Sequence, residues 1–120
     1  ASLLRPLVEG RVEPYVRSRF DCPGAVVCHC FVRRYLPEER RSLRAHFDHH
    51  AFVTCVLGLN CEEHTGGLFV QGGPGAARRL VPLRRGDAVL HQFDLRHGVE
   101  VGRGPRLSLV LWALDSAALL

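Results

Sequence analysis

Apolar and polar side chains alternate along most of this chain, at the two-residue spacing of extended backbone. The pattern is clearest in residues 25–36 and 51–60, which are also rich in the β-branched and aromatic residues that favour strands. Clusters of glycine and proline, such as 72–75 and 102–105, separate the alternating segments as turns would. About seven or eight short strands with this punctuation predict an all-β domain of the jelly-roll type.

A helical period of apolar residues occurs near the start of the chain, in residues 2–20. Gly10 and Pro14 interrupt this period, so we expect one broken helix or two short helices, the second opened by Pro14. We expect residues 1–24 to support a single domain by covering an apolar face of its sheet. Residues 25–115 would then form the β core.

The stretch 97–112 contains a predicted strand with one face that carries polar side chains and one face that is entirely apolar. In its second half one face carries Arg106, Ser108, Val110 and Trp112, and the other carries Leu107, Leu109 and Leu111. A cation, a hydroxyl and an indole on a buried face are costly unless they meet polar partners. The first face therefore predicts the wall of a pocket, and the apolar face has to be covered.

A candidate metal site joins this stretch to an earlier one. His46 and Asp48 point the same way if their segment is extended, and His97 follows Asp48 by 49 residues. Two histidines and one carboxylate form the facial triad of non-haem iron(II) oxygenases, which leaves three coordination positions open. His50 has the same parity as His46 and is a rival ligand.

Arg106 lies nine residues after His97, and Trp112 lies fifteen after it. The motif residues are HFD, VTCVLGLN, GGLF, VPLRRGDAVL and HGVEVGRGPRLSLVLW. With these motifs the chain resembles the 2-oxoglutarate- and iron(II)-dependent dioxygenases, specifically the prolyl 4-hydroxylase-like branch that includes the oxygen-sensing prolyl hydroxylases. The resemblance runs from about residue 26 to residue 115. It implies a double-stranded β-helix, with metal and cosubstrate between the two sheets.

The resemblance also implies a role for each motif residue. His46, Asp48 and His97 would bind iron(II), because the family's first pair precedes a strand by a few residues; His50 would then lie at the rim. The cosubstrate 2-oxoglutarate would chelate the metal, and its far carboxylate would pair with Arg106, whose planar guanidinium suits bidentate pairing.

Further residues are predicted to lie near the cosubstrate. Family members often carry a pocket tyrosine on the strand of Tyr35, and Trp112 would line the pocket beside the metal. The oxygen-sensing enzymes have another tyrosine where Gly58 stands in this chain. Either Thr54, Ser108 or water substitutes for that tyrosine, or the pocket is wider here.

The implied activity is hydroxylation of a substrate C–H bond with release of succinate and carbon dioxide, with ascorbate as a reductant, as in relatives. The resemblance favours a prolyl residue in a peptide or protein; another side chain or a free small molecule is the alternative. Two other interpretations stay open. One is a catalytically inactive β-helix that acts as a binding module. The other is a cupin-like metal protein, which would make no use of Arg106.

The charged and apolar residues of the chain limit the kinds of partner that we expect. The net charge of +4 comes from arginine alone, because the chain has no lysine, and this excludes Schiff-base chemistry on a lysine. The arginines are scattered among 12 acidic residues, so we expect no nucleic-acid partner and a monomer. No apolar run approaches the roughly 18 residues of a membrane span, so no membrane association is expected.

Cysteine content suggests the compartment. Five cysteines, an odd number without a C-x-x-C motif, argue against a disulfide framework and favour a reducing compartment, the cytoplasm or the nucleus. We expect them to be small buried hydrophobes rather than zinc ligands. Arginine and glutamate in the first 20 residues argue against a secretory leader. The absence of methionine leads us to expect a processed or trimmed product, or a domain of a longer protein.

Overall fold

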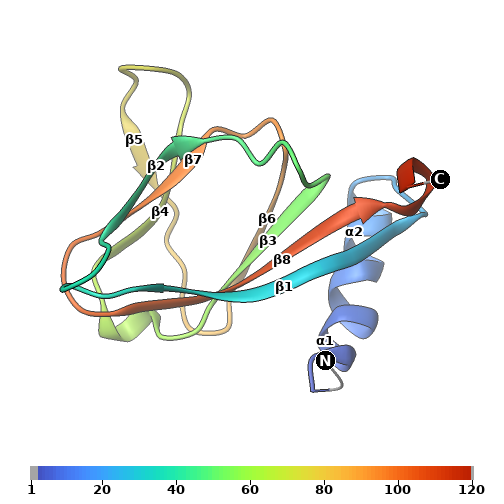
Figure 1. The fold of residues 1–120 in the computed structure, drawn as a ribbon, viewed down its shortest axis with the longest axis horizontal. Coiled ribbons are helices and arrows are strands. Elements are labelled where there is room, and N and C mark those ends of the chain that lie inside the picture. Colours follow the sequence, from blue (N-terminus) through green and yellow to red (C-terminus); the bar gives the residue numbers. More distant parts are fainter. Residues whose placement is uncertain (1–2, 120) are drawn as a thin grey trace.

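A computed structural model of the chain describes residues 3–119, in which eight strands form two antiparallel sheets of four (Figure 1). The strands are β1 (Ala25–Tyr35), β2 (Ser42–His46), β3 (Val53–Gly58), β4 (Gly66–Gln71), β5 (Arg78–Leu80), β6 (Ala88–Gln92), β7 (His97–Val101) and β8 (Arg106–Asp115). One sheet has the order β1-β8-β3-β6, and the other has the order β2-β7-β4-β5.

The pairing of these strands is that of a jelly roll. The pairs β1/β8, β2/β7, β3/β6 and β4/β5 are nested, so the chain behaves like one long antiparallel hairpin folded over into two sheets. The predicted all-β jelly roll, a double-stranded β-helix, is therefore confirmed. Strand β2 was not predicted, because the segment before His46 is charged and short. Its formation matters, since β2 ends at the first predicted ligand.

The N-terminal helix is continuous and runs through α1 (Arg5–Leu7), a wider π-helical turn η1 (Val8–Val12) and α2 (Glu13–Arg19). The predicted interruption at Gly10 is present as this wider turn rather than as a break, and Pro14 stands in the first turn of α2. Two short 3-10 turns, η2 (Cys61–Glu63) and η3 (Ser116–Leu119), add helical geometry that was not predicted. None of the helices within residues 3–119 is long and apolar enough to span a membrane.

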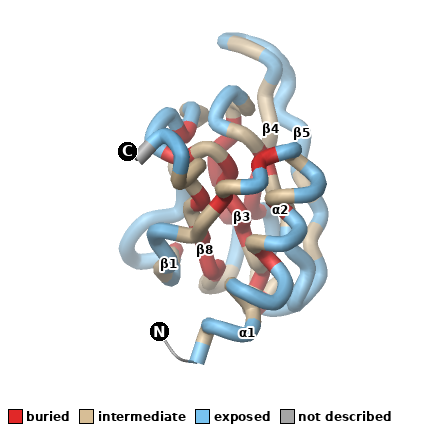
Figure 2. The backbone as a smooth tube through the Cα atoms, turned by 90° about the vertical axis from the view of Figure 1, so that its right-hand side faces the viewer, coloured by how far each residue is buried: buried red, intermediate tan, exposed pale blue. Residues whose placement is uncertain are grey.

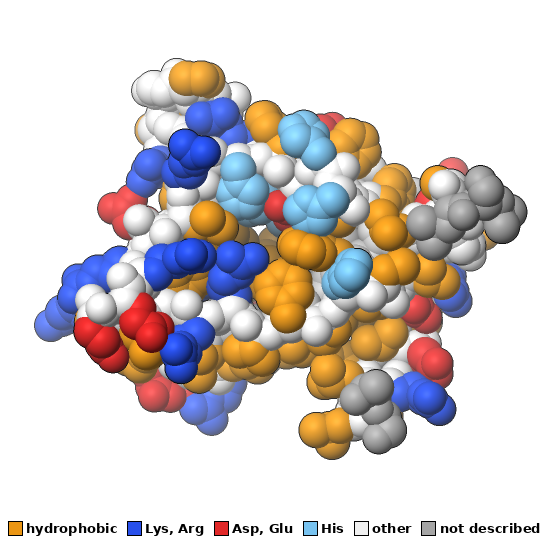
Figure 3. Space-filling view, viewed as in Figure 1, with side chains coloured by type: hydrophobic (Ala, Val, Ile, Leu, Met, Phe, Trp, Pro, Cys, Tyr) orange, Lys and Arg blue, Asp and Glu red, His pale blue; other side chains and the backbone are white. Residues whose placement is uncertain are grey.

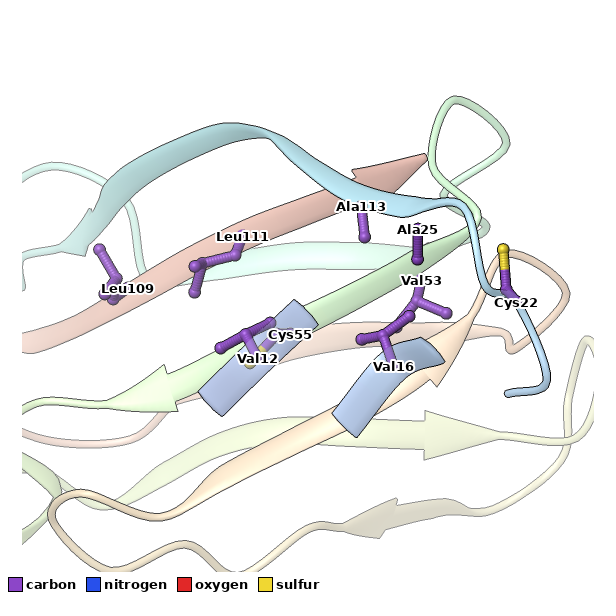
Figure 4. Close-up of a cluster of buried hydrophobic side chains, with 9 residues drawn as sticks. All are labelled: Val12, Val16, Cys22, Ala25, Val53, Cys55, Leu109, Leu111 and Ala113. Atoms are coloured by element: carbon purple, nitrogen blue, oxygen red, sulfur yellow. The ribbon is translucent and has the colours of Figure 1, made fainter. Parts of the chain in front are cut away.

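The main apolar core lies between this helix and the outer face of the β1-β8-β3-β6 sheet (Figure 4). Val12 and Val16 pack against Val53, Cys55 and Leu111, all of which are buried. Figure 2 shows the same concentration of buried residues in β3 and β8. The helix therefore covers the apolar face of the last strand, as its alternation predicts.

The cysteines depart from expectation. Cys22 and Cys55 are buried, but Cys28 and Cys30 on β1 are exposed, so the prediction that they are buried hydrophobes was wrong. The reason is their place in the fold, because β1 is an edge strand and the helix covers only part of the sheet. All five cysteines are free thiols.

Candidate metal centre and its pocket

His46, Asp48 and His97 converge between the two sheets. Strand β2 ends at His46 and β7 begins at His97, and pairing of these strands places the two residues opposite each other. Asp48 follows in the loop after β2, and its carboxylate oxygens lie 3.2 Å from His46 Nε2 and 3.4 Å from His97 Nε2. The three potential ligand atoms all lie within 4.8 Å of one another, a separation that one metal ion can bridge.

The two imidazoles are held in the orientation that a metal ligand needs. His46 Nδ1 lies 2.8 Å from the carbonyl oxygen of Arg44, and His97 Nδ1 lies 2.9 Å from that of Leu95. A carbonyl oxygen only accepts, so Nδ1 donates on each ring and Nε2 is the nitrogen left to face Asp48, where a metal ion would displace any proton that it carries. Backbone contacts of this kind fix the tautomer and the ring plane of metal-bound histidines.

The carboxylate of the cluster is buried and ionised. Burial alone would raise the pKa of Asp48, but hydrogen bonds from His97 and Thr54 and the charges of the histidines hold its pKa far below the usual range. Thr54 donates its hydroxyl proton to Asp48 Oδ2 over 2.7 Å. Burial lowers the pKa of His97, but hydrogen bonds to Asp48 and Leu95 raise it more. A metal ion would therefore compete with a proton for His97.

Arg106 places a second charged group in the same cavity. Its side chain is only 4% exposed, and it makes no ion pair with any residue in the described range. Its guanidinium makes one long contact of 3.4 Å to the Ser108 hydroxyl and lies 5.8 Å from the centre of the Tyr35 ring. Burial lowers its pKa. An unpaired buried cation costs several kcal/mol, so the site is suited to an anion.

Asn60 holds the start of β8 in place, a role that sequence reasoning missed. Its buried side-chain amide donates to the carbonyl oxygen of Pro105 over 3.0 Å, and its side-chain oxygen accepts from the backbone N–H of Leu107 over 2.8 Å. These bonds clamp the backbone on both sides of Arg106. An asparagine directly after an apolar strand was the only signal in the sequence, and such residues are usually turn formers.

The residues around Gly58 bear on whether the pocket is wider here, where the oxygen-sensing enzymes have a tyrosine. A side chain built on Gly58 would collide with Cys61 Sγ, so the thiol already fills this space. A pocket made wider at this point, one of the alternatives that the sequence left open, is therefore not favoured. Of the predicted substitutes, Thr54 is engaged by Asp48, and Ser108, which lies opposite Gly58 on β8, accepts the long contact from Arg106.

All eight residues predicted for the site line one cavity of about 50 Å³ between the sheets. They are Tyr35, His46, Asp48, Thr54, His97, Arg106, Ser108 and Trp112. Arg33, Leu43, Val56, Leu68, Val99 and Val110 complete the wall, and of these only Val110 was predicted. Exposed His50 lies outside the ligand cluster, with its ring 4.0 Å from the Trp112 ring, so it is a rim residue.

His91 supports the cluster from behind. Its buried ring lies 4.2 Å from the ring of His97, and its Nε2 has no hydrogen-bond partner among residues 3–119. Burial lowers its pKa, which favours a neutral ring. This second imidazole packs on His97 without being one of the converging ligands.

Solved structures with the same fold are known. A 2OG-Fe(II) oxygenase family oxidoreductase from Burkholderia pseudomallei matches 95% of this chain with a TM-score of 0.77 and 21% identity. The α-ketoglutarate-dependent non-haem epimerase SnoN from nogalamycin biosynthesis matches 96% with a TM-score of 0.73 and 21% identity. AviO1 from Streptomyces viridochromogenes matches 88% with a TM-score of 0.71 and 17% identity.

The matched regions make up 56%, 57% and 57% of those three proteins, so this chain spans little more than half of their length. No protein-family model and no curated protein matches the sequence. At these identities the likeness concerns the fold. The chain has the jelly-roll fold of the 2OG-Fe(II) oxygenase structures, with a candidate His-Asp-His metal site between its sheets.

Proposed function

We propose that this chain is the core of an iron(II)- and 2-oxoglutarate-dependent dioxygenase that hydroxylates a substrate C–H bond. One observation carries the proposal: the three converging ligand atoms and a buried, unpaired Arg106 face the same cavity. A metal protein with other chemistry needs the first feature but not the second. Its structural neighbours support the same cofactor set, since one is a 2OG-Fe(II) oxygenase family protein and another is an α-ketoglutarate-dependent non-haem epimerase.

The residues present fit both groups. His46, Asp48 and His97 would hold iron(II) through Nε2, a carboxylate oxygen and Nε2, the donor set that this metal takes in non-haem oxygenases. Arg106 would pair with the far carboxylate of 2-oxoglutarate and thereby lose its uncompensated burial. Bound metal and cosubstrate supply the oxidant: one atom of dioxygen enters the substrate hydroxyl and the other enters succinate, and carbon dioxide leaves.

The protein's own part is orientation and exclusion of water. Thr54 and the carbonyls of Arg44 and Leu95 hold the ligands in place before the metal arrives, which lowers the entropic cost of binding it. The apolar wall of the cavity, from Val56, Leu68 and other residues, keeps bulk water away from the reacting carbon.

The substrate and the accessory reductant are finer parts of the same proposal. A prolyl residue in a peptide is the first substrate to test, because the sequence motifs resemble the prolyl 4-hydroxylase-like branch. Ascorbate would serve as the reductant, as in that branch. The substrate would be a peptide or a small molecule, and no nucleic acid is invoked.

The test is an anaerobic titration of iron(II)-loaded protein with 2-oxoglutarate, followed through the visible charge-transfer band of the chelate. We expect a saturable band that Arg106→Gln weakens and Arg103→Gln leaves unchanged. Arg103 is the matched control, because it lies three residues away and is exposed. Bound iron without any band would contradict the proposal and favour a binding module or a cupin-like protein.

A further inference from the structure

Arg33 brings a second guanidinium to the cavity. It lies two positions before Tyr35 on β1, so both side chains point toward the same face, and both line the cavity. Within residues 3–119 no carboxylate forms an ion pair with Arg33. Its neighbour Arg34 points to the opposite face and pairs with Glu39 over 3.0 Å. One of two adjacent arginines is thus neutralised at the surface, and the other faces the pocket unpaired.

Aromatic contacts hold the Arg33 side chain in place. Its guanidinium carbon lies 5.2 Å from the centre of the Phe31 ring, within the range of a cation–π contact. Burial raises the pKa of Tyr35, and the positive charges of Arg33 and Arg106 oppose that rise, which places both arginines near this tyrosine. A hydrogen bond from Arg33 also opposes that rise, so Tyr35 engages one of its N–H donors and the others can meet an anion.

An apolar wall continues from Phe31 to the metal ligands. The Phe31 ring packs edge-on against Trp112 at 4.8 Å, and the His50 ring lies 4.0 Å from the same indole, also edge-on. The indole Nε1 is buried and has no hydrogen-bond partner among the described residues. Figure 3 shows the outcome on the surface, a hollow with arginine and hydrophobic side chains along one edge and histidines along the other.

The charges of the cavity are unequal. Asp48 is the only carboxylate among its lining residues, and His46, His97 and Thr54 already engage it. Two lining guanidiniums lack a carboxylate partner, and the proposed cosubstrate would satisfy only Arg106, because its other carboxylate belongs at the metal. The guanidinium of Arg33 would then still lack an anionic partner.

We propose that Arg33 anchors the substrate, and that the substrate is the small-molecule alternative to a prolyl peptide: a small carboxylate with an apolar body that lies against Phe31 and Trp112. This inference rests on the proposed function, since it assigns Arg106 to 2-oxoglutarate. The carboxylate would pair with Arg33, and the adjoining carbon atoms would lie along the indole toward His46 and the metal.

The single tryptophan of the chain makes the test direct, because all indole fluorescence comes from Trp112. Protein saturated with manganese(II) and 2-oxoglutarate is titrated with benzoate, phenylacetate and hexanoate, each beside its neutral amide. Manganese prevents turnover, and the saturating cosubstrate keeps Arg106 occupied. We expect at least one acid to bind about tenfold or more tighter than its amide, as a charge-assisted pair requires. Arg33→Gln should abolish that preference, while Arg34→Gln, the control on the opposite face, should retain it.

Three results would overturn the inference. The first is that none of the acids binds in preference to its amide, and the second is that the preference survives Arg33→Gln. The third is that Arg33→Gln weakens 2-oxoglutarate binding as much as Arg106→Gln does. In the last case Arg33 belongs to the cosubstrate site.

A separate titration with 2-oxoglutarate alone distinguishes this failure from failure of the proposed function. If that binding does not depend on Arg106, the dioxygenase proposal fails. The acids are then titrated without cosubstrate, and a preference that Arg33→Gln abolishes supports an anion site on a protein with different chemistry.

Discussion

The two faces of β8 follow opposite rules. On its outer face Leu109, Leu111 and Ala113 are buried under the N-terminal helix in an apolar cluster. Burying a leucine in this way stabilises the folded state by about 1.5–3 kcal/mol. On its inner face the same strand carries Arg106, a buried charge without an ion-pair partner, and Trp112, whose buried N–H has none either.

Buried polar or charged groups without a partner, such as Arg106 and the Trp112 N–H, reduce stability unless a bound ligand pairs with them. The comparison teaches that one strand, through simple alternation, separates the residues that stabilise the fold from those that bind. Substitutions on the two faces should therefore have effects that separate just as cleanly, on stability for one face and on binding for the other.

The largest binding effect is expected at the metal ligands. Asp48→Ala removes the only carboxylate of the cluster, and metal affinity should fall by more than about a hundredfold, since even outer partners of metal ligands are worth 10–100-fold. Calorimetric titration with manganese(II) or iron(II) measures this. Asp94→Ala, an exposed aspartate near His97 in sequence, is the control and should bind metal normally. Equal affinities in the two variants would mean that the three ligands do not act together.

The largest stability effect is expected on the outer face. Leu111→Ala leaves a cavity under the helix and should lower the free energy of unfolding by about 2–5 kcal/mol. The folded fraction should still bind metal with unchanged affinity. Denaturant unfolding measures the first quantity, with Leu80→Ala as the control, because Leu80 is 54% exposed. A loss of metal affinity in folded Leu111→Ala would show that the two faces are coupled.

Arg106→Met should have smaller effects, and they should be opposite in sign: higher stability of the ligand-free protein, and loss of 2-oxoglutarate binding. Removing an unpaired buried charge should raise the free energy of unfolding by about 1 kcal/mol in the absence of ligand. Added 2-oxoglutarate should raise the Tm of metal-loaded wild-type protein by mass action but leave the variant unaffected. A strong destabilisation by Arg106→Met would instead show that the guanidinium is needed for folding.

The smallest effect concerns Cys55 on the outer face. Burial raises its pKa to about 11, against about 8.5 for a free thiol. The stabilisation that comes from burying Cys55 as a neutral thiol is complete below the pKa of a free thiol. It is lost as the pH rises toward the pKa of Cys55 in the folded protein. At mildly alkaline pH, alkylation of Cys55 should be slow and should follow unfolding, whereas exposed Cys28 reacts at once. Mass spectrometry of timed samples measures both, and equal rates would mean that the helix does not protect this face.

The local pattern of the sequence determined much of this protein. Strand alternation predicted which side chains of β8 face the pocket and which face the helix, because successive residues of a strand point to opposite sides. The spacing of His46, Asp48, His97 and Arg106 identified the set that meets in the cavity, because the motif as a whole is specific even though each part is not.

Only the tertiary structure decided what lies next to what. Cys61 fills the space beside Gly58, Asn60 clamps the start of β8, and Arg33 becomes the unpaired member of an arginine pair. The Asn60 bonds join segments that are distant in sequence, the position of Cys61 depends on how the turn η2 follows β3, and Arg33 reaches the cavity because β1 pairs with β8. Periodicity within one segment carries no information about its neighbours in space, so these contacts follow from the packing of the two sheets.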